Sequence, residues 1–331
     1  MGHMNKIFAA LLFMIMAAEA NAQQKIEIIA PKRVSHDEFP ESTASSKNMQ
    51  LLSIAPGERQ LSYYHDVTFC TRGNVDLHLQ IIQPAAPGNE TMPCIVYIQG
   101  SAWMKQNVYG NLLQLAKFAE RGYTIAIVEY RPSSVSGFPA QVQDAKTAIR
   151  FMRKNAAKYK IDTQNVFVWG DSSGGHTALL TGLTWDIPEF DTPEYPEYPI
   201  NVNAVIDFYG PTDITQMNLE PSTMDHILPT SPEGMLIGGK NVLENRDAAA
   251  RTNPISYVTD KNKCAPILIL HGSKDRLVPF KQSVLLANAL EEHHYEYVFY
   301  QLKGADHGSY EFWTKASFDK VEAFLKKYTV K

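Results

Sequence analysis

Two hydrophobic patterns along the chain predict its strands. Residues 66–70 (DVTFC) and 75–84 (VDLHLQIIQP) alternate between apolar and polar positions on either side of a turn at residues 72–74. This alternation predicts an antiparallel hairpin. Residues 92–100 (MPCIVYIQG) and 165–170 (NVFVWG) are instead almost continuously apolar. Because a strand in a parallel sheet is buried on both faces, these runs predict central parallel strands.

Segments with helical spacing alternate with the strands. The predicted helices cover residues 111–122, 140–160, 173–183, 283–293 and 318–328, and the further strands cover residues 123–131, 203–210, 265–272 and 295–302. This alternation predicts an α/β fold with a mostly parallel sheet covered on both faces, and the hairpin adds antiparallel strands at one edge. Residues 213–253 have no clear period and are too long for an ordinary connection, which favours a cap or binding loop.

The composition indicates a folded protein with a slight excess of acidic residues. The chain has 331 residues, a formal charge of −4 and a sequence pI near 6.2, and 44% of its residues are hydrophobic. A chain of this kind can bury a full core, and α/β folds of more than about 250 residues often form one unit. No cluster of Lys and Arg interrupts the acidic balance, so no nucleic-acid partner is expected.

The N-terminal region is expected to lie outside the main fold. Residues 1–3 look like a cloning remnant, and residues 4–22 combine a positive Lys6, an apolar stretch and a small-residue cleavage signal. This pattern predicts a secretory signal peptide and therefore an exported protein, periplasmic or secreted; its apolar stretch is too short for a membrane span. Residues 23–60 lack periodicity and are predicted to be an arm, which leaves residues 61–331 as the main domain.

The stretch GDSSGGH at residues 170–176 lies between a predicted buried strand and a predicted helix. Its first five residues fit G-x-S-x-G, and the strand-turn-helix context is the one that a nucleophile elbow requires. In so tight a turn Ser172 adopts a strained backbone that lifts its hydroxyl above the sheet, and the flanking glycines avoid collisions. Ser173 is expected to contribute its backbone N–H and not its hydroxyl. A glycine-rich turn with a purely structural role is the alternative.

A serine nucleophile at such an elbow is followed in the chain by an acid and then by a histidine base. His307, in GADHGS, lies in a glycine-flanked loop after the last strand, from which an imidazole can reach the edge of the sheet. Asp275, in HGSKDRLVP, follows a buried strand and is the expected acid, with Asp213 in YGPTD as the alternative. Asp306 is expected to point away, and His271, at a strand end, to have a backbone role.

An oxyanion that forms at this serine needs two N–H donors. One donor is expected from Ser173 and the other from the loop at residues 100–103, which follows the strand that begins at Met92. The EEHH string at residues 291–294 lacks the spacing of a zinc-binding helix. No metal and no cofactor are therefore expected.

Together these motifs resemble the α/β-hydrolase superfamily from about Tyr64 on, and within it the bacterial esterase/lipase group related to hormone-sensitive lipase. The motifs that carry the resemblance are GDSSGGH, VEYRPS, YGPTD, SPEGMLIGG followed by NPISYV, HGSKDRLVP and GADHG. The resemblance implies the α/β-hydrolase fold. It also implies Ser172 as nucleophile, Asp275 as acid and His307 as base.

The resemblance further implies which loop residues hold the oxyanion. Ser101 and Ala102 match the donor positions of the group. The loop departs from the usual pattern, however, because Gln99, Gly100 and Ser101 stand where the group usually has His-Gly-Gly.

The group includes acetyl-xylan-esterase-like and feruloyl-esterase-like members. The resemblance therefore implies a serine carboxylesterase for a small-molecule or carbohydrate ester, with acetyl groups on plant polysaccharide as the first expectation and feruloyl groups as the second. Trp103 and Tyr209 are expected to line an aromatic entrance for this substrate. A peptidase of the prolyl-oligopeptidase type and a non-catalytic carbohydrate-binding protein are the alternatives, and the oligomeric state stays open.

Overall fold

The computed structural model describes residues 28–53, 60–85 and 90–331. The predicted signal peptide at residues 4–22, with the remnant before it, lies outside these residues and stays a prediction. The described residues 28–53 contain no helix or strand, and their side chains are exposed.

By its internal contacts the chain divides into two units, Met1–Ile54 and Ala55–Lys331. All helices and strands described below belong to the second unit. Among the described residues, no helix is long and apolar enough to cross a membrane.

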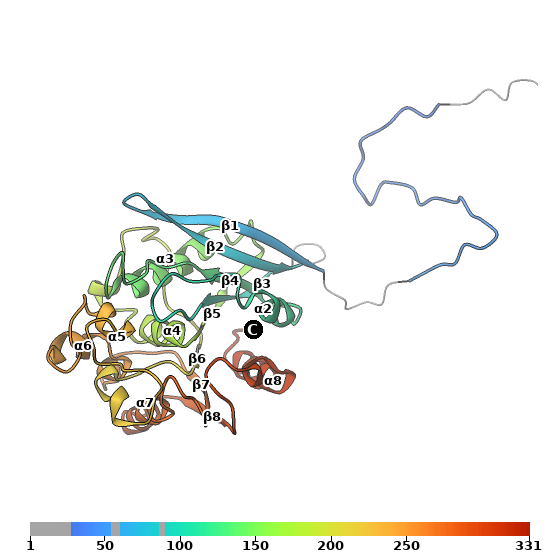
Figure 1. The fold of residues 1–331 in the computed structure, drawn as a ribbon. Helices are drawn as coiled ribbons and strands as arrows, with labels where there is room; N and C mark the ends of the chain where they lie inside the picture. The colour runs from blue at the N-terminus through green and yellow to red at the C-terminus, as the bar shows by residue number, and fades with distance from the viewer. Residues whose placement is uncertain (1–27, 54–59, 86–89) are drawn as a thin grey trace, which may run out of the picture. The chain divides into compact units, whose positions relative to one another are not determined.

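Eight strands form one sheet, in the order β1-β2-β4-β3-β5-β6-β7-β8 (Figure 1). The strands are β1 (Leu61–Arg72), β2 (Val75–Pro84), β3 (Met92–Ile98), β4 (Thr124–Val128), β5 (Ile161–Asp171), β6 (Val205–Phe208), β7 (Ile267–Gly272) and β8 (Tyr297–Leu302). Strands β1 and β2 form the predicted antiparallel hairpin, and β2 also pairs antiparallel with β4. The pairings from β4 across β3 to β8 are all parallel. The predicted mostly parallel sheet is therefore confirmed.

The central strands are buried on both faces, as their continuous apolar sequences predict. In β3, Cys94, Val96 and Ile98 pack into the core on one face of the sheet. Ile95 and Tyr97, between them in the sequence, pack into the core on the other face. Side chains alternate along a strand, so a strand with a core on each side must be apolar at every position.

Helices cover both faces of the sheet (Figure 1). The main helices are α2 (Leu112–Ala119), α3 (Ala140–Lys154), α4 (Ser173–Leu183), α7 (Lys281–Glu292) and α8 (Lys315–Lys327). Helices α3, α4 and α7 contribute apolar side chains to the core on one face, and α2 and α8 to the core on the other. In α3 the residues that join this core, Ala145, Ala148, Ile149 and Met152, follow the spacing of one helical face.

The predicted irregular insertion at residues 213–253 consists of short helices between β6 and β7. It contains a 3-10 helix at Ile214–Leu219 and the helices α5 (Pro232–Leu236) and α6 (Arg246–Thr252). Ile214, Leu236 and Val242 from this insertion form a small core of their own with Trp103. The insertion is thus packed against the loop that follows β3.

Helix α3 also carries a buried lysine. Lys146 is fully buried, its amine donates a hydrogen bond to the carbonyl of Thr184, and it faces the ring of Phe190 at 5.4 Å. Burial lowers the pKa of Lys146 to about 7. The unfolded chain binds this proton up to the ordinary lysine pKa of about 10.4, so the folded protein gains stability as the pH rises from 7 towards that value.

We expect the free energy of unfolding of the wild type to rise relative to that of Lys146→Met by up to about 1.4 kcal/mol per pH unit between pH 7 and pH 9. Urea unfolding at several pH values measures this difference. Lys154→Met, which changes an exposed lysine of the same helix, is the control and should give a curve parallel to the wild type. A curve for Lys146→Met that is also parallel would contradict the expectation.

Candidate active site

Ser172 lies at the turn between β5 and α4, in a backbone conformation that side chains rarely adopt, with φ 54° and ψ −126°. The glycines around it make the turn possible. A Cβ on Gly174 would lie 1.9 Å from the carbonyl oxygen of Ile98, and a Cβ on Gly170 would lie 2.1 Å from the carbonyl oxygen of Gly174. Both contacts are with backbone, so no side chain fits at either position. The strand-turn-helix context predicted for this motif is thus present.

Three polar side chains form a hydrogen-bonded row at this turn. Nε2 of His307 lies 2.9 Å from Oγ of Ser172, and Nδ1 of His307 lies 2.8 Å from Oδ2 of Asp275. Ser172 follows β5, Asp275 follows β7 and His307 follows β8. The carboxyl ends of parallel strands meet at one edge of the sheet, and this edge is where α/β folds bind ligands. The structure therefore brings together the three residues that the sequence predicts as nucleophile, base and acid.

The carboxylate of Asp275 is held in a fully buried position. Its Oδ1 accepts hydrogen bonds from the backbone N–H groups of Leu277 and Val278, each at 2.9 Å. Burial alone would raise the pKa of Asp275, but hydrogen bonds and charge from His271 and His307 hold this pKa below its ordinary range. The carboxylate is thus ionised and fixes Nδ1 of His307 as the protonated nitrogen.

His271 is a residue of the site that sequence reasoning missed. Its Nε2 lies 3.0 Å from the backbone oxygen of Val278, which fits the expected backbone role, and also 3.2 Å from Oδ2 of Asp275. Its Nδ1 lies 2.7 Å from Oγ of Ser283. The spacing of four residues between His271 and Asp275 was the available signal. A side chain that ends a buried strand and a side chain in the following turn can meet at that spacing.

The two other acids considered from the sequence have different partners. Asp213 caps the 3-10 helix of the insertion, where it accepts hydrogen bonds from the backbone and hydroxyl of Thr215. Asp306 forms an ion pair with Arg276 and accepts the backbone N–H of His307 at 2.8 Å. Neither carboxylate takes the position that Asp275 has beside the imidazole.

One of the oxyanion donors predicted in the loop after β3, the backbone N–H of Ser101, is not available for that role. The backbone N–H of Ser101 donates to Oγ of Ser173 at 2.9 Å, so it is already used. The hydroxyl of Ser173, which was expected to have no role, is therefore the group that holds this loop. Among the described residues, no protein acceptor is found for the backbone N–H of Ala102 or for that of Ser173. These two N–H groups remain the candidate donors.

Neither predicted aromatic residue forms an exposed entrance, because Trp103 and Tyr209 are each only 1% exposed. The indole N–H of Trp103 donates to Nδ1 of His176 at 3.1 Å, and its ring is covered by the insertion. The ring of Tyr209 packs edge-on against the imidazole of His307, with ring centres 4.7 Å apart. Trp103 is thus a buried residue beside Ser172, and Tyr209 packs against the imidazole of His307.

Ser172 lines a small cavity of about 30 Å³. Ala102 and Trp103 form one wall of this cavity, and His226, Pro232 and Glu233 of the insertion form another. A volume of this size holds roughly two water molecules. We call it the Ser172 cavity.

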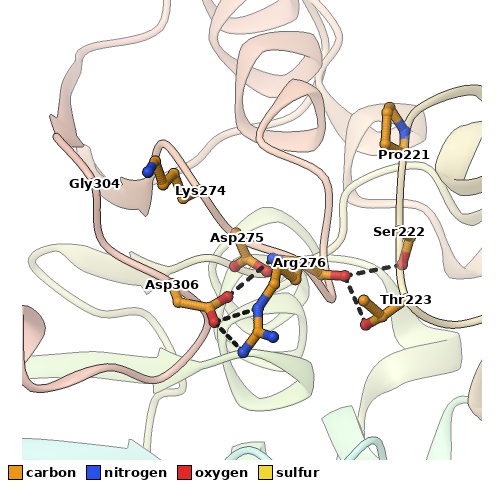
Figure 2. Close-up of a pocket in the computed structure, with 8 residues that line it drawn as sticks. All are labelled: Pro221, Ser222, Thr223, Lys274, Asp275, Arg276, Gly304 and Asp306. Atoms are coloured by element: carbon orange, nitrogen blue, oxygen red, sulfur yellow. Dashed lines mark hydrogen bonds and ion pairs between the residues drawn. The ribbon is translucent and has the colours of Figure 1, made fainter.

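A much larger hollow, of about 590 Å³, begins at the loop that carries Asp275 (Figure 2). Its walls come from the loops after β7 and β8 and from the insertion; they are Pro221, Ser222, Thr223, Lys274, Asp275, Arg276, Gly304 and Asp306. Figure 2 shows the guanidinium of Arg276 against the carboxylate of Asp306, and the backbone oxygen of Arg276 within reach of the hydroxyls of Ser222 and Thr223. We call this hollow the Arg276 groove.

The side chains at this turn supply reactive groups of several kinds. Within the described part of the chain, no group of His, Cys, Asp and Glu side chains is arranged to hold a metal ion. The arrangement of Ser172, His307 and Asp275 supplies a hydroxyl, a base in contact with it and a buried negative charge behind that base. These are the parts that nucleophilic catalysis by serine requires.

Comparison with known proteins identifies the family of this chain. The family model described as BD-FAE matches residues 79–290, a range that includes Ser172 and Asp275. The chain belongs to the BD-FAE family. The match ends before His307, so the base of this BD-FAE protein is assigned from its position beside Ser172 and not from the match.

Several relatives are described as esterases. Esterase LipC of Mycobacterium tuberculosis is 28% identical over 65% of this chain. The chain spans about half the length of the curated relatives it matches, 53% in the case of LipC.

Solved structures resemble this BD-FAE protein over more of its length. A truncated form of a carbohydrate esterase from gut microbiota is 28% identical, with a TM-score of 0.72, over 84% of this chain and 99% of that chain. Esterase Est2 of Thermogutta terrifontis, solved with propionate bound, is 25% identical, with a TM-score of 0.63, over 82% of this chain and 94% of that chain. These neighbours confirm the predicted α/β-hydrolase fold.

A fluorophosphonate probe tests the nucleophile without assuming a substrate. We expect one label per BD-FAE chain, on Ser172, because its hydroxyl is the one in contact with the imidazole. Ser172→Ala should take no label, and His307→Gln should slow labelling by roughly 10²-fold or more, since the base is lost.

Intact-mass and peptide mass spectrometry measure both the extent and the position of labelling. Ser173→Ala is the matched control and should still be labelled at residue 172, because the hydroxyl of Ser173 only holds the loop. A label that survives in Ser172→Ala, or that disappears in Ser173→Ala while the protein remains folded, would contradict the assignment.

Proposed function

We propose that this chain is a carboxylic ester hydrolase that works through an acyl-enzyme on Ser172. The observation that carries the proposal is the row of Ser172, His307 and Asp275 at a strained strand-to-helix turn, with contacts of 2.9 and 2.8 Å. The membership of the BD-FAE family and the esterases among the relatives support it.

The first half of the reaction forms the acyl-enzyme. Oγ of Ser172 attacks the ester carbonyl carbon while Nε2 of His307 takes the hydroxyl proton. The ionised Asp275 stabilises the imidazolium that results. The negative charge on the carbonyl oxygen is met by the backbone N–H groups of Ser173, at the start of α4, and Ala102. The intermediate then expels the alcohol, which takes its proton from Nε2 of His307.

The second half releases the acid. Water enters the place left by the alcohol and gives a proton to Nε2 of His307 as its oxygen attacks the acyl carbon. The second tetrahedral intermediate uses the same two N–H donors. When it collapses, Oγ of Ser172 recovers its proton from the imidazolium and the carboxylic acid leaves.

The acyl group of the proposed substrate is small, with acetyl as the first choice. The Ser172 cavity of about 30 Å³ is the described space beside the nucleophile, and it is enclosed by Trp103, Pro211 and Pro232. An acetyl methyl fits a space of that size, whereas an aromatic feruloyl group needs several times more. The propionate bound to the neighbouring Est2 is likewise a small acid.

The alcohol of the proposed substrate is a carbohydrate. The support is the neighbouring structure described as a carbohydrate esterase from gut microbiota, together with the export that residues 4–22 predict. Acetyl groups on plant polysaccharide are the specific form of this proposal.

We expect hydrolysis of nitrophenyl esters to fall steeply from acetate to butyrate to hexanoate, because only the shortest chain fits the Ser172 cavity. Steady-state kcat/KM for the series measures the decline. Ser172→Ala should lose about 10⁶-fold in turnover on acetate, as for catalytic groups that act as a unit.

Two further substrates in the same assay separate the alternatives. Methyl ferulate should be a poor substrate, and a dipeptide amide should not be hydrolysed. A higher kcat/KM on methyl ferulate than on nitrophenyl acetate would replace acetyl by feruloyl as the acyl group. Hydrolysis of the amide alone would point to a peptidase.

The acid is tested by a pair of matched substitutions. Asp275→Asn should lower kcat on nitrophenyl acetate by about 10⁴-fold, because the amide favours the wrong tautomer of His307. Asp213→Asn, at the alternative acid, should leave kcat within a few-fold of the wild type, since that carboxylate caps a helix of the insertion. Measured kcat values in which Asp213→Asn is the more damaging change would reverse the assignment.

A further inference from the structure

The Arg276 groove and the Ser172 cavity are neighbours that share one wall. Arg276 lines the groove, whereas Leu277, the next residue, lines the cavity. Ser222 of the groove also contacts His226 of the cavity, with Oγ of Ser222 2.9 Å from Nε2 of the imidazole. Oγ of the same serine donates to the carbonyl oxygen of Leu277 at 2.9 Å. A single layer of residues therefore separates the small hollow from the large one.

In the proposed mechanism the acyl group and the alcohol of the ester occupy different hollows. The Ser172 cavity is too small for more than a short acyl group, so the alcohol must lie elsewhere. The alcohol takes its proton from His307 and therefore leaves on the side of that residue. The Arg276 groove begins there, because Asp306 precedes His307 and Asp275 is its hydrogen-bond partner. Its volume of about 590 Å³ is within the usual range of about 300–1,000 Å³ for ligand pockets.

The charged side chains of the groove leave one positive charge without a partner. Arg276 and Asp306 neutralise each other in an ion pair. The carboxylate of Asp275 is fully buried, and its partners are His307 and His271. The amine of Lys274 has no ion-pair or hydrogen-bond partner among the described residues, and in Figure 2 no interaction is drawn to it.

The uncharged residues of the Arg276 groove can contact a sugar ring and its hydroxyl groups. Figure 2 shows Lys274 and Gly304 on one side of the groove and Pro221, Ser222 and Thr223 on the other. The ring of Pro221 offers an apolar surface, and the hydroxyl of Thr223 keeps lone pairs that can accept hydrogen bonds while it donates to Arg276. Just outside the groove, Glu220 is paired with Lys281 and adds no net charge.

We propose that the Arg276 groove binds the alcohol part of the substrate and that this part is a saccharide bearing a carboxylate, with Lys274 as the residue that recognises the acid. This inference rests on the proposed ester hydrolysis and adds the chemical class of the alcohol. The carboxylate of a uronic acid unit pairs with the free amine, while the sugar face lies against Pro221 and the stem of Arg276.

Binding of two matched oligosaccharides tests the groove directly. The probes are a xylo-oligosaccharide that carries one glucuronic acid and the same oligosaccharide without it. Titration of Ser172→Ala, which cannot turn over an ester, is followed by calorimetry at low salt. We expect the acidic oligosaccharide to bind more tightly by up to roughly fivefold, the upper end for one exposed ion pair, and the difference to shrink at high salt.

Substitutions at Lys274 identify the recognising residue. Lys274→Ala should remove the preference for the acidic oligosaccharide and Lys274→Glu should reverse it, while Lys303→Ala, at an exposed lysine outside the groove, should keep it. With O-acetylated forms of the two probes, the wild-type preference should appear in KM and not in kcat.

The outcomes separate this inference from the proposed activity. Equal binding of the two oligosaccharides, no binding of either at millimolar concentration, or a preference that survives in Lys274→Glu would overturn the groove assignment. Circular-dichroism spectra of Lys274→Ala and Lys274→Glu that match the wild type show that the substitutions leave the fold intact. If the wild type binds the acidic probe but hydrolyses no ester, the proposed ester hydrolysis is wrong, whereas the proposed binding of an acidic saccharide in the Arg276 groove is supported.

Discussion

The close contact between the start of α4 and the end of β3 is the constraint on which the site depends. The main chain at Gly174 lies so near the carbonyl of Ile98 that a Cβ would come within 1.9 Å of that oxygen. This contact fixes where α4 begins and forces Ser172 into its strained conformation. It also brings the first turn of α4 beside the loop after β3, so that the hydroxyl of Ser173 can accept the N–H of Ser101. One close approach of two backbones thus sets the positions of both the candidate nucleophile and the candidate oxyanion donors.

A second set of contacts places the buried negative charge. Asp275 is a carboxylate without access to water, a state that costs several kcal/mol unless polar partners surround it. Here two backbone N–H groups and two imidazoles surround it. His271, held in turn by Ser283, completes the set and leaves His307 free to turn its Nε2 towards Ser172. The stability of this charge therefore depends on β7 and α7 as much as on the loop that carries it.

The sequence predicts those parts of the molecule that local chemistry dictates. Continuous apolar runs predict the central strands because burial on both faces leaves no polar positions, and the glycines around Ser172 predict the turn because no other residue fits there. What the sequence could not predict depends on contacts between distant segments. The N–H of Ser101 is used by a hydroxyl 72 residues further along. The ring of Trp103 is covered because the insertion, more than a hundred residues later, folds over it.

The insertion between β6 and β7 connects the two sides of the proposed substrate site. His226 is fixed between Glu233 and Ser222, with contacts of 2.9 Å on both ring nitrogens. Glu233 lines the small cavity beside Ser172, whereas Ser222 lines the Arg276 groove and donates to the backbone of the loop that carries Asp275. A change in the insertion can therefore alter the size of the acyl cavity or the shape of the groove while Ser172, His307 and Asp275 keep their places on the sheet. In the proposed mechanism, specificity and chemistry are carried by different segments, because rigid strands hold the reacting groups and a packed insertion shapes what reaches them.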